Sequence, residues 1–84
     1  MAQATADPTA YISHWTDHDG QTVWQAIGPS GLPVCRETPD ASHARAAYLA
    51  LWKQSAKWDW QERSYVSPLP ADPPVWDGDR GAFE

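Results

Sequence analysis

The stretch YISHWTDHDGQTVWQAI, residues 11–27, predicts a β-hairpin. Aromatic and β-branched residues alternate on both sides of Asp19-Gly20, and glycine readily adopts the left-handed backbone conformation that a tight hairpin turn needs. We therefore expect one strand over residues 10–16 and a second over residues 21–27. The alternation leaves open which face of the sheet packs on the rest of the molecule.

A second turn and a third strand are expected after this hairpin. Gly28-Pro29-Ser30-Gly31 is typical of a turn, and residues 32–37 can form a short strand. Pro33 lacks a backbone N–H, so it limits this strand to the edge of a sheet or requires the strand to begin there. The sequence thus predicts a three-stranded antiparallel meander.

A helix is predicted next, because Thr38-Pro39-Asp40 has the features of a helix start. The Thr38 hydroxyl can accept a hydrogen bond from a free backbone N–H, Pro39 suits the first helical position, and the Asp40 charge favours the positive end of the helix dipole. Asp40 as the capping residue is the alternative. The residues at helical spacing form one apolar stripe about 100° wide. They are Ala41, Ala44, Tyr48, Leu51, Trp52 and Ser55.

This helical stripe is expected to pack on one face of the sheet. Its partners are Trp15 or Ile12 from the first strand and Trp24 or Ile27 from the second, depending on register.

Residues 57–61 allow two interpretations. Either the helix ends near Ala56 and the aromatic rings of Trp58 and Trp60 share one face of an extended segment, or the helix continues and one of the two lies in solvent or against the tail. Tyr65-Val66 could add a fourth strand before Ser67-Pro68 stops it.

The predicted fold class is α+β, with a three-stranded antiparallel meander followed by one amphipathic helix over residues 10–67. Residues 1–9 hold no hydrophobic anchor and are expected to be a flexible N-terminal arm. Proline and glycine recur through residues 68–84, which predicts an extended, polyproline-like, acidic tail. Trp76 in this tail either packs back on the domain or serves as the aromatic anchor of a linear binding motif.

The charge of the chain is −5 and is unevenly distributed. Acidic residues outnumber basic ones in residues 1–37 and again in residues 68–84, whereas residues 38–67 carry a slight excess of Lys and Arg. A nucleic-acid footprint needs clustered Lys and Arg, so this distribution opposes direct binding of phosphate through the sheet. It favours a basic protein surface as the partner.

No residues in a catalytic pattern are found in the sequence. No Ser, Cys or Thr has a recognisable base beside it, and no glycine-rich loop has the spacing of a phosphate-binding or dinucleotide-binding motif. We therefore expect no enzyme activity and no cofactor. Cys35 is the single cysteine, so no internal disulfide can form, and the N-terminus lacks the pattern of a secretory signal. These features predict a cytoplasmic protein.

His14 and His18, with Asp17 and Asp19 beside them, are the residues whose types could suit a metal site. Two imidazoles four residues apart can share a metal on a helix, but this segment is predicted as a strand and a turn, where that spacing separates them. Asp17 and Asp19 also lack the other oxygen ligands of a calcium loop. No metal site is predicted.

The binding site is expected to consist of carboxylates and one tryptophan. The carboxylates would steer and orient the complex, and Trp76 would contribute most of the binding energy. The predicted partner-binding residues are Asp17 and Asp19 at the hairpin tip and Asp72, Trp76, Asp77 and Asp79 in the tail.

The predicted order of three strands and a helix resembles small β-sheet DNA-binding domains, namely those related to the plant AP2 domain and the arm-binding domains of tyrosine recombinases. The resemblance covers residues 11–57 and is architectural. Those domains line the exposed sheet face with Arg and Lys, whereas here the strands offer Ser13, His14, Gln25 and Arg36. A DNA-binding role is therefore not carried over.

In size and character, without a shared motif, the chain also resembles the small virus-encoded inhibitors of host defence systems, including anti-CRISPR proteins. The resemblance implies a phage-encoded protein in the host cytoplasm that occludes a basic nucleic-acid-binding surface of a protein or ribonucleoprotein complex. No contact with a membrane is expected, and the oligomeric state stays open. A small DNA-binding sheet module and an adaptor subunit of a larger assembly are the alternatives.

Overall fold

A β-hairpin begins the part of the chain that the computed structural model describes, residues 10–83, and the expected arm over residues 1–9 lies outside it. Strands β1 (Tyr11–Thr16) and β2 (Thr22–Ile27) pair in antiparallel register. The Asp17 carboxylate accepts the backbone N–H groups of Asp19 and Gln21, and Gly20 adopts a left-handed φ of 80°. The predicted hairpin is confirmed.

The predicted third strand is wrong, because residues 32–37 follow β2 without forming a regular strand. Two isolated bridges join this segment to β2, Ile27 with Pro33 and Trp24 with Thr38. Between the bridges the segment contains more residues than β2, so it bulges. Pro33 has no N–H to donate, and the Cys35 sulfur accepts the Ala26 N–H in place of a backbone carbonyl.

Helix α1 (Ala41–Ser55) begins after Asp40, whose side chain accepts hydrogen bonds from the backbone N–H and the hydroxyl of Ser42. Asp40 is therefore the capping residue, and the Thr38 hydroxyl instead accepts the Asp40 N–H. The backbone becomes extended at Ala56, which ends the helix before Trp58 and Trp60.

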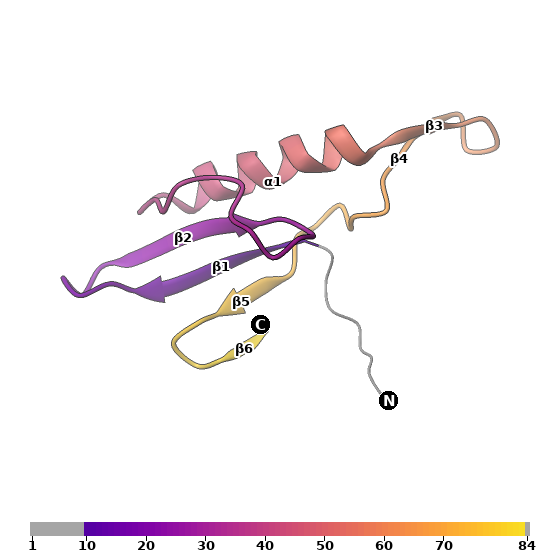
Figure 1. Ribbon diagram of the computed structural model, residues 1–84. Helices are drawn as coiled ribbons and strands as arrows, with labels where there is room; N and C mark the ends of the chain where they lie inside the picture. Colours follow the sequence, from indigo (N-terminus) through magenta and orange to yellow (C-terminus); the bar gives the residue numbers. More distant parts are fainter. Residues whose placement is uncertain (1–9, 84) are drawn as a thin grey trace.

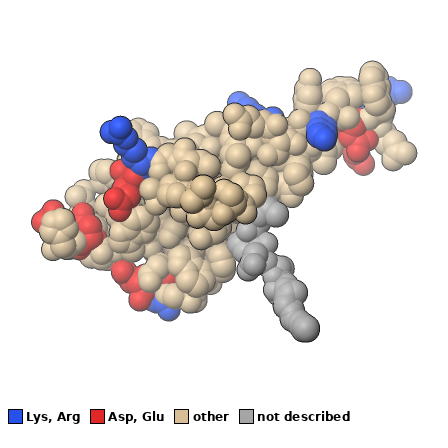
Figure 2. Space-filling view, viewed as in Figure 1, with Lys and Arg blue, Asp and Glu red and all other residues tan. Residues whose placement is uncertain are grey.

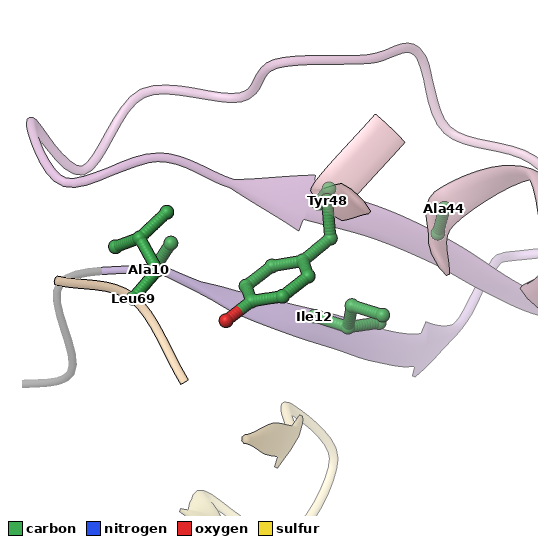
Figure 3. Packing of buried hydrophobic residues seen from close by; sticks show 6 residues of the cluster. Ala10, Ile12, Ala44, Tyr48 and Leu69 are labelled. Carbon is green, nitrogen blue, oxygen red and sulfur yellow. The ribbon is translucent and has the colours of Figure 1, made fainter. Parts of the chain in front are cut away.

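The core lies between α1 and one face of the sheet (Figure 3). Ala44 and the fully buried Tyr48 of α1 pack against Ile12 of β1 and Ala26 of β2. Trp24, on the same side as Ile12, packs at the margin of this cluster. Because side chains alternate along a strand, Trp15 and Ile27 point to the opposite face of the sheet.

The segment expected as an extended tail supplies two strands, which is a second correction. Strand β5 (Val75–Asp77) pairs with β1 in parallel, and β6 (Ala82–Phe83) pairs with β5, giving the sheet order β2-β1-β5-β6. The Ile12 N–H donates a hydrogen bond to the Pro74 carbonyl, and the Gly78 N–H donates one to the His14 carbonyl. The prolines stop before residue 75, so β5 keeps all of its backbone donors.

Strands β3 (Lys57–Asp59) and β4 (Ser64–Val66) form a separate hairpin that projects past the end of α1 (Figure 1). The strand suggested at Tyr65-Val66 therefore exists, but it pairs with β3. The predicted β-β-β-α order is wrong, because only two strands precede the helix and four follow it. The described residues form a flat, elongated molecule of 49 × 34 × 19 Å.

Candidate functional site

Two turns far apart in sequence meet at one end of the sheet. One carboxylate oxygen of Asp79 accepts hydrogen bonds from the backbone N–H of Thr16, at 3.0 Å, and from its hydroxyl, at 2.7 Å. Thr16 immediately precedes Asp17, so Asp79 joins the carboxylates of the β1–β2 turn. We call Asp17, Asp19 and Asp79 the acidic edge. Figure 2 shows acidic side chains gathered at this end of the molecule.

Asp79 is held in its charged form by these contacts. The hydrogen bonds from the Thr16 side chain and backbone lower the pKa of Asp79 below its ordinary value of 3.8. The carboxylate is exposed, so it remains accessible to a partner while Thr16 fixes its position.

The other two carboxylates of the acidic edge differ in accessibility. Asp17 is half-buried and uses one oxygen to close the hairpin turn. Asp19 is exposed, and the nearest partner of its side chain is His18, with 3.6 Å between the carboxylate oxygen and the ring nitrogen. Asp19 is therefore readily reached from solvent.

Asp77 and Asp72, both predicted to bind the partner, have contacts of their own. Asp77 is buried, accepts the N–H groups of Asp79 and Arg80, and forms an ion pair with the Arg80 side chain at 3.3 Å. It shapes the turn between β5 and β6. Asp72 pairs with Arg45 of α1 at 3.1 Å, so it is tied to the helix and not to the acidic edge.

Trp76 lies on the face of the sheet opposite the helix. Its ring contacts that of Phe83, with 4.7 Å between centroids, and Phe83 contacts Tyr11 at 5.4 Å. These three rings and residues 28–31 line an open groove of about 450 Å³. Trp76 therefore offers apolar surface on this face of the sheet, while part of it packs within the sheet. The groove lies toward the end of β1 and β2 that is opposite to the acidic edge.

The β3–β4 hairpin carries a second aromatic surface. The sequence allowed either a helix or an extended chain for residues 57–61, and the structure has an extended strand that ends in a turn. The Trp58 ring contacts Trp60 at 5.8 Å and Tyr65 at 5.2 Å. Asp59 is the residue in this segment that favours a turn, because an Asp side chain can accept hydrogen bonds from backbone N–H groups that follow it. In the structure its carboxylate accepts hydrogen bonds from the N–H groups of Gln61 and Glu62. Trp58 and Tyr65 are seven residues apart in the sequence, and the turn brings them together as register partners.

Residues 10–83 contain no group of three or more His, Cys, Asp or Glu side chains that could hold a metal ion. The single helix found there is too short and too polar to cross a membrane. His14 stacks on Trp24, with 4.7 Å between ring centroids, so this imidazole is part of the packing on the helix side of the sheet.

Comparison with protein-family models, with curated proteins and with solved structures found no match to this chain. The arrangement of the acidic edge and of the aromatic groove is therefore the basis for its functional interpretation. Both are surfaces suited to binding: the first offers fixed negative charge, and the second offers aromatic contact area.

Proposed function

We propose that this chain is a non-enzymatic inhibitor that binds a basic, nucleic-acid-binding surface of a host defence complex and blocks it by occupying it. The protein would be encoded by a phage or another mobile element and would act in the host cytoplasm, as anti-CRISPR proteins do. The observation that carries the proposal is the pair of hydrogen bonds from Thr16 to Asp79, which unites carboxylates from the two ends of the chain.

A fixed set of carboxylates suits this role for two reasons. Negative charge speeds the encounter with a basic channel and orients the complex. Since Asp17 and Asp79 are already held by hydrogen bonds, binding orders fewer side chains and loses less conformational entropy. The aromatic groove beside Trp76 would add the apolar contact that carboxylates alone lack.

The partner-binding residues are accordingly revised. Asp19, Asp79 and Trp76 are proposed as direct contacts, and Asp17 as a contact that also closes its turn. Asp77 is proposed to position the β5–β6 turn and not to touch the partner.

The test is a competition assay with purified RNA-guided effector complexes and a fluorescent target DNA. The chain is titrated against each complex, and the DNA that remains bound is measured. We expect loss of DNA binding at about one chain per binding site for at least one complex. The Asp19→Lys variant should weaken this inhibition by about tenfold or more, which corresponds to about 1.4 kcal/mol.

Glu62→Lys is the matched control, because it makes the same change of charge on the exposed turn of the β3–β4 hairpin. It should inhibit like the unchanged chain. Equal weakening by both variants would show that only the net charge matters. Binding of the chain to the DNA itself would instead favour a nucleic-acid-binding sheet that uses its open aromatic face.

A further inference from the structure

The β3–β4 hairpin exposes an aromatic face that no other described element covers. Trp58 and Tyr65 are register partners and so lie on the same face of the hairpin, and the Trp60 ring packs against Trp58. Trp58 is 42% exposed, Tyr65 is 64% exposed and Trp60 is 82% exposed. We call these three residues the aromatic face.

This hairpin stands apart from the rest of the fold. Within residues 10–83, and apart from the direct chain connection between Ser55 and Lys57, neither of its strands comes within 8 Å, Cα to Cα, of α1 or of a strand of the main sheet. A two-stranded hairpin is at best marginally stable in water unless a further layer covers its apolar side. Clustered exposed aromatic side chains are also typical of protein interfaces.

We propose that the aromatic face packs against the same face of a second copy of the chain, forming a symmetric dimer. In such a dimer each hairpin supplies the layer that the other lacks. Trp58, Trp60 and Tyr65 of each copy become buried between the two hairpins.

The distribution of charge favours a second copy at this end of the molecule. Two chains of net charge −5 repel one another, and the acidic edge, where that charge is concentrated, lies at the far end of the main sheet (Figure 1). The hairpin instead carries both signs, with Lys57 and Arg63 against Asp59 and Glu62. These charges cancel, so a second copy meets no net repulsion from the hairpin itself.

The aromatic face itself fits an uncharged partner surface. Side chains alternate along a strand, so Lys57 and Asp59 lie on the side of β3 opposite to Trp58. A nucleic acid would meet no matching positive charge on this face. Two copies of the face present aromatic rings to one another, for which edge-to-face packing is favourable.

The area involved predicts a weak dimer. If an aromatic side chain presents about 150 to 250 Å², the exposed parts of the three residues amount to roughly 300 to 450 Å² per copy. Two copies would bury roughly 600 to 900 Å² through these side chains, which is below the usual size of a stable interface. We therefore expect a dissociation constant in the micromolar range or weaker.

The test is sedimentation velocity of the full chain over a wide range of concentrations, up to the millimolar range. We expect a monomer that converts to a dimer as concentration rises. Trp60→Ser should shift this conversion to at least about tenfold higher concentration, because Trp60 is the most exposed of the three residues. Leu32→Ser is the matched control, since Leu32 is a 66% exposed apolar residue outside the hairpin, and it should leave the conversion unchanged.

Circular dichroism with thermal unfolding verifies that each variant is folded, and Tyr65→Ser provides a second variant of the same face. A monomer at all concentrations would overturn the proposal. So would a dimer that Trp60→Ser and Tyr65→Ser leave intact, or one that salt dissociates, because an apolar interface is not weakened by salt.

Discussion

Tyr48 is fully buried, and its hydroxyl donates a hydrogen bond to the Pro70 carbonyl. It joins α1 to the segment that leads into β5 and packs beside Ile12 and Leu69 (Figure 3). Burial, with a smaller contribution from the Asp72 charge, raises the pKa of Tyr48 above its ordinary value of 10.0. The hydroxyl therefore stays protonated and able to donate at neutral pH.

Tyr48→Phe should lower the free energy of unfolding by about 1 kcal/mol, because the Pro70 carbonyl loses its donor. Tyr48→Ala should lower it by about 3 to 5 kcal/mol, since it also leaves a cavity. Urea unfolding followed by tryptophan fluorescence measures both. An unchanged stability in Tyr48→Phe would mean that the hydroxyl contributes nothing to the attachment of the C-terminal segment.

Asp79 gives the protein a specific response to acid. Its pKa is lowered in the folded state by the Thr16 hydrogen bonds, from an ordinary value of 3.8. The stability that Asp79 contributes is fully present when the pH is above the pKa of this carboxyl in the unfolded chain. It is lost as the pH falls through the lower pKa that the carboxyl has in the folded protein. Asp79→Asn should therefore be less stable than the unchanged chain at pH 7, with a difference that shrinks below about pH 4.

Urea unfolding at neutral and acidic pH measures this difference, and Asp19→Asn serves as the control. Asp19 is exposed and makes no hydrogen bond to another segment in the described structure, so its variant should show no such convergence. A constant difference between Asp79→Asn and the unchanged chain across this pH range would contradict the Thr16–Asp79 contact.

The sequence predicted the carboxylates but not their separate roles. Asp17 and Asp19 were placed at a hairpin tip from turn chemistry alone, and the structure has them there. Asp79 and Asp72 have different roles because Asp79 contacts Thr16 and Asp72 contacts Arg45, and each of these partners is remote in sequence. Local patterns contain no information on such pairings.

At the scale of elements, short strands were the hardest features to predict. β5 has three residues, and β3 and β4 have three each, too few to show alternation. Residues 32–37 looked like a strand, yet Pro33 and the sulfur of Cys35 interrupt the ladder beside β2. The start of the helix was predicted to within about two residues. Of the two interpretations of residues 57–61, the structure has the one in which the helix ends near Ala56.

The β3–β4 hairpin contains one strained residue. Arg63 adopts a left-handed φ of 53°, which is unfavourable for a side chain other than glycine, Asn or Asp. Arg63→Gly should stabilise the hairpin by about 0.5 to 1 kcal/mol, and Gln61→Gly in the same turn, where φ is negative, should destabilise it. Amide hydrogen exchange in β3 and β4 measures both variants. Faster exchange in Arg63→Gly would contradict the left-handed turn.

At the scale of the whole molecule, the C-terminal segment is an internal part of the sheet. β5 lies between β1 and β6, and the connection from β2 runs through α1 and the β3–β4 hairpin (Figure 1). Parallel pairing of β1 with β5 joins residues more than sixty positions apart, for example Ile12 with Val75. No period in the sequence predicts such a pairing, which explains why an extended tail without strands was predicted.

This topology also separates the two proposed binding surfaces. The acidic edge forms where the β1–β2 and β5–β6 turns meet, and the aromatic face projects beyond the far end of α1. A dimer joined through the aromatic face would leave both acidic edges free. Two such edges could engage a repeated basic partner more tightly than one.

The return of the C-terminal segment to β1 is tested most directly by amide hydrogen exchange followed by NMR. The amides to follow are Ile12, which donates to Pro74, Gly78, which donates to His14, and Thr16, which donates to Asp79. We predict that all three exchange far more slowly than an unstructured chain, and that Asp79→Asn speeds exchange at Thr16 most. Exchange at unprotected rates at Ile12 and Gly78 would mean that the segment does not join the sheet, and the acidic edge would not exist.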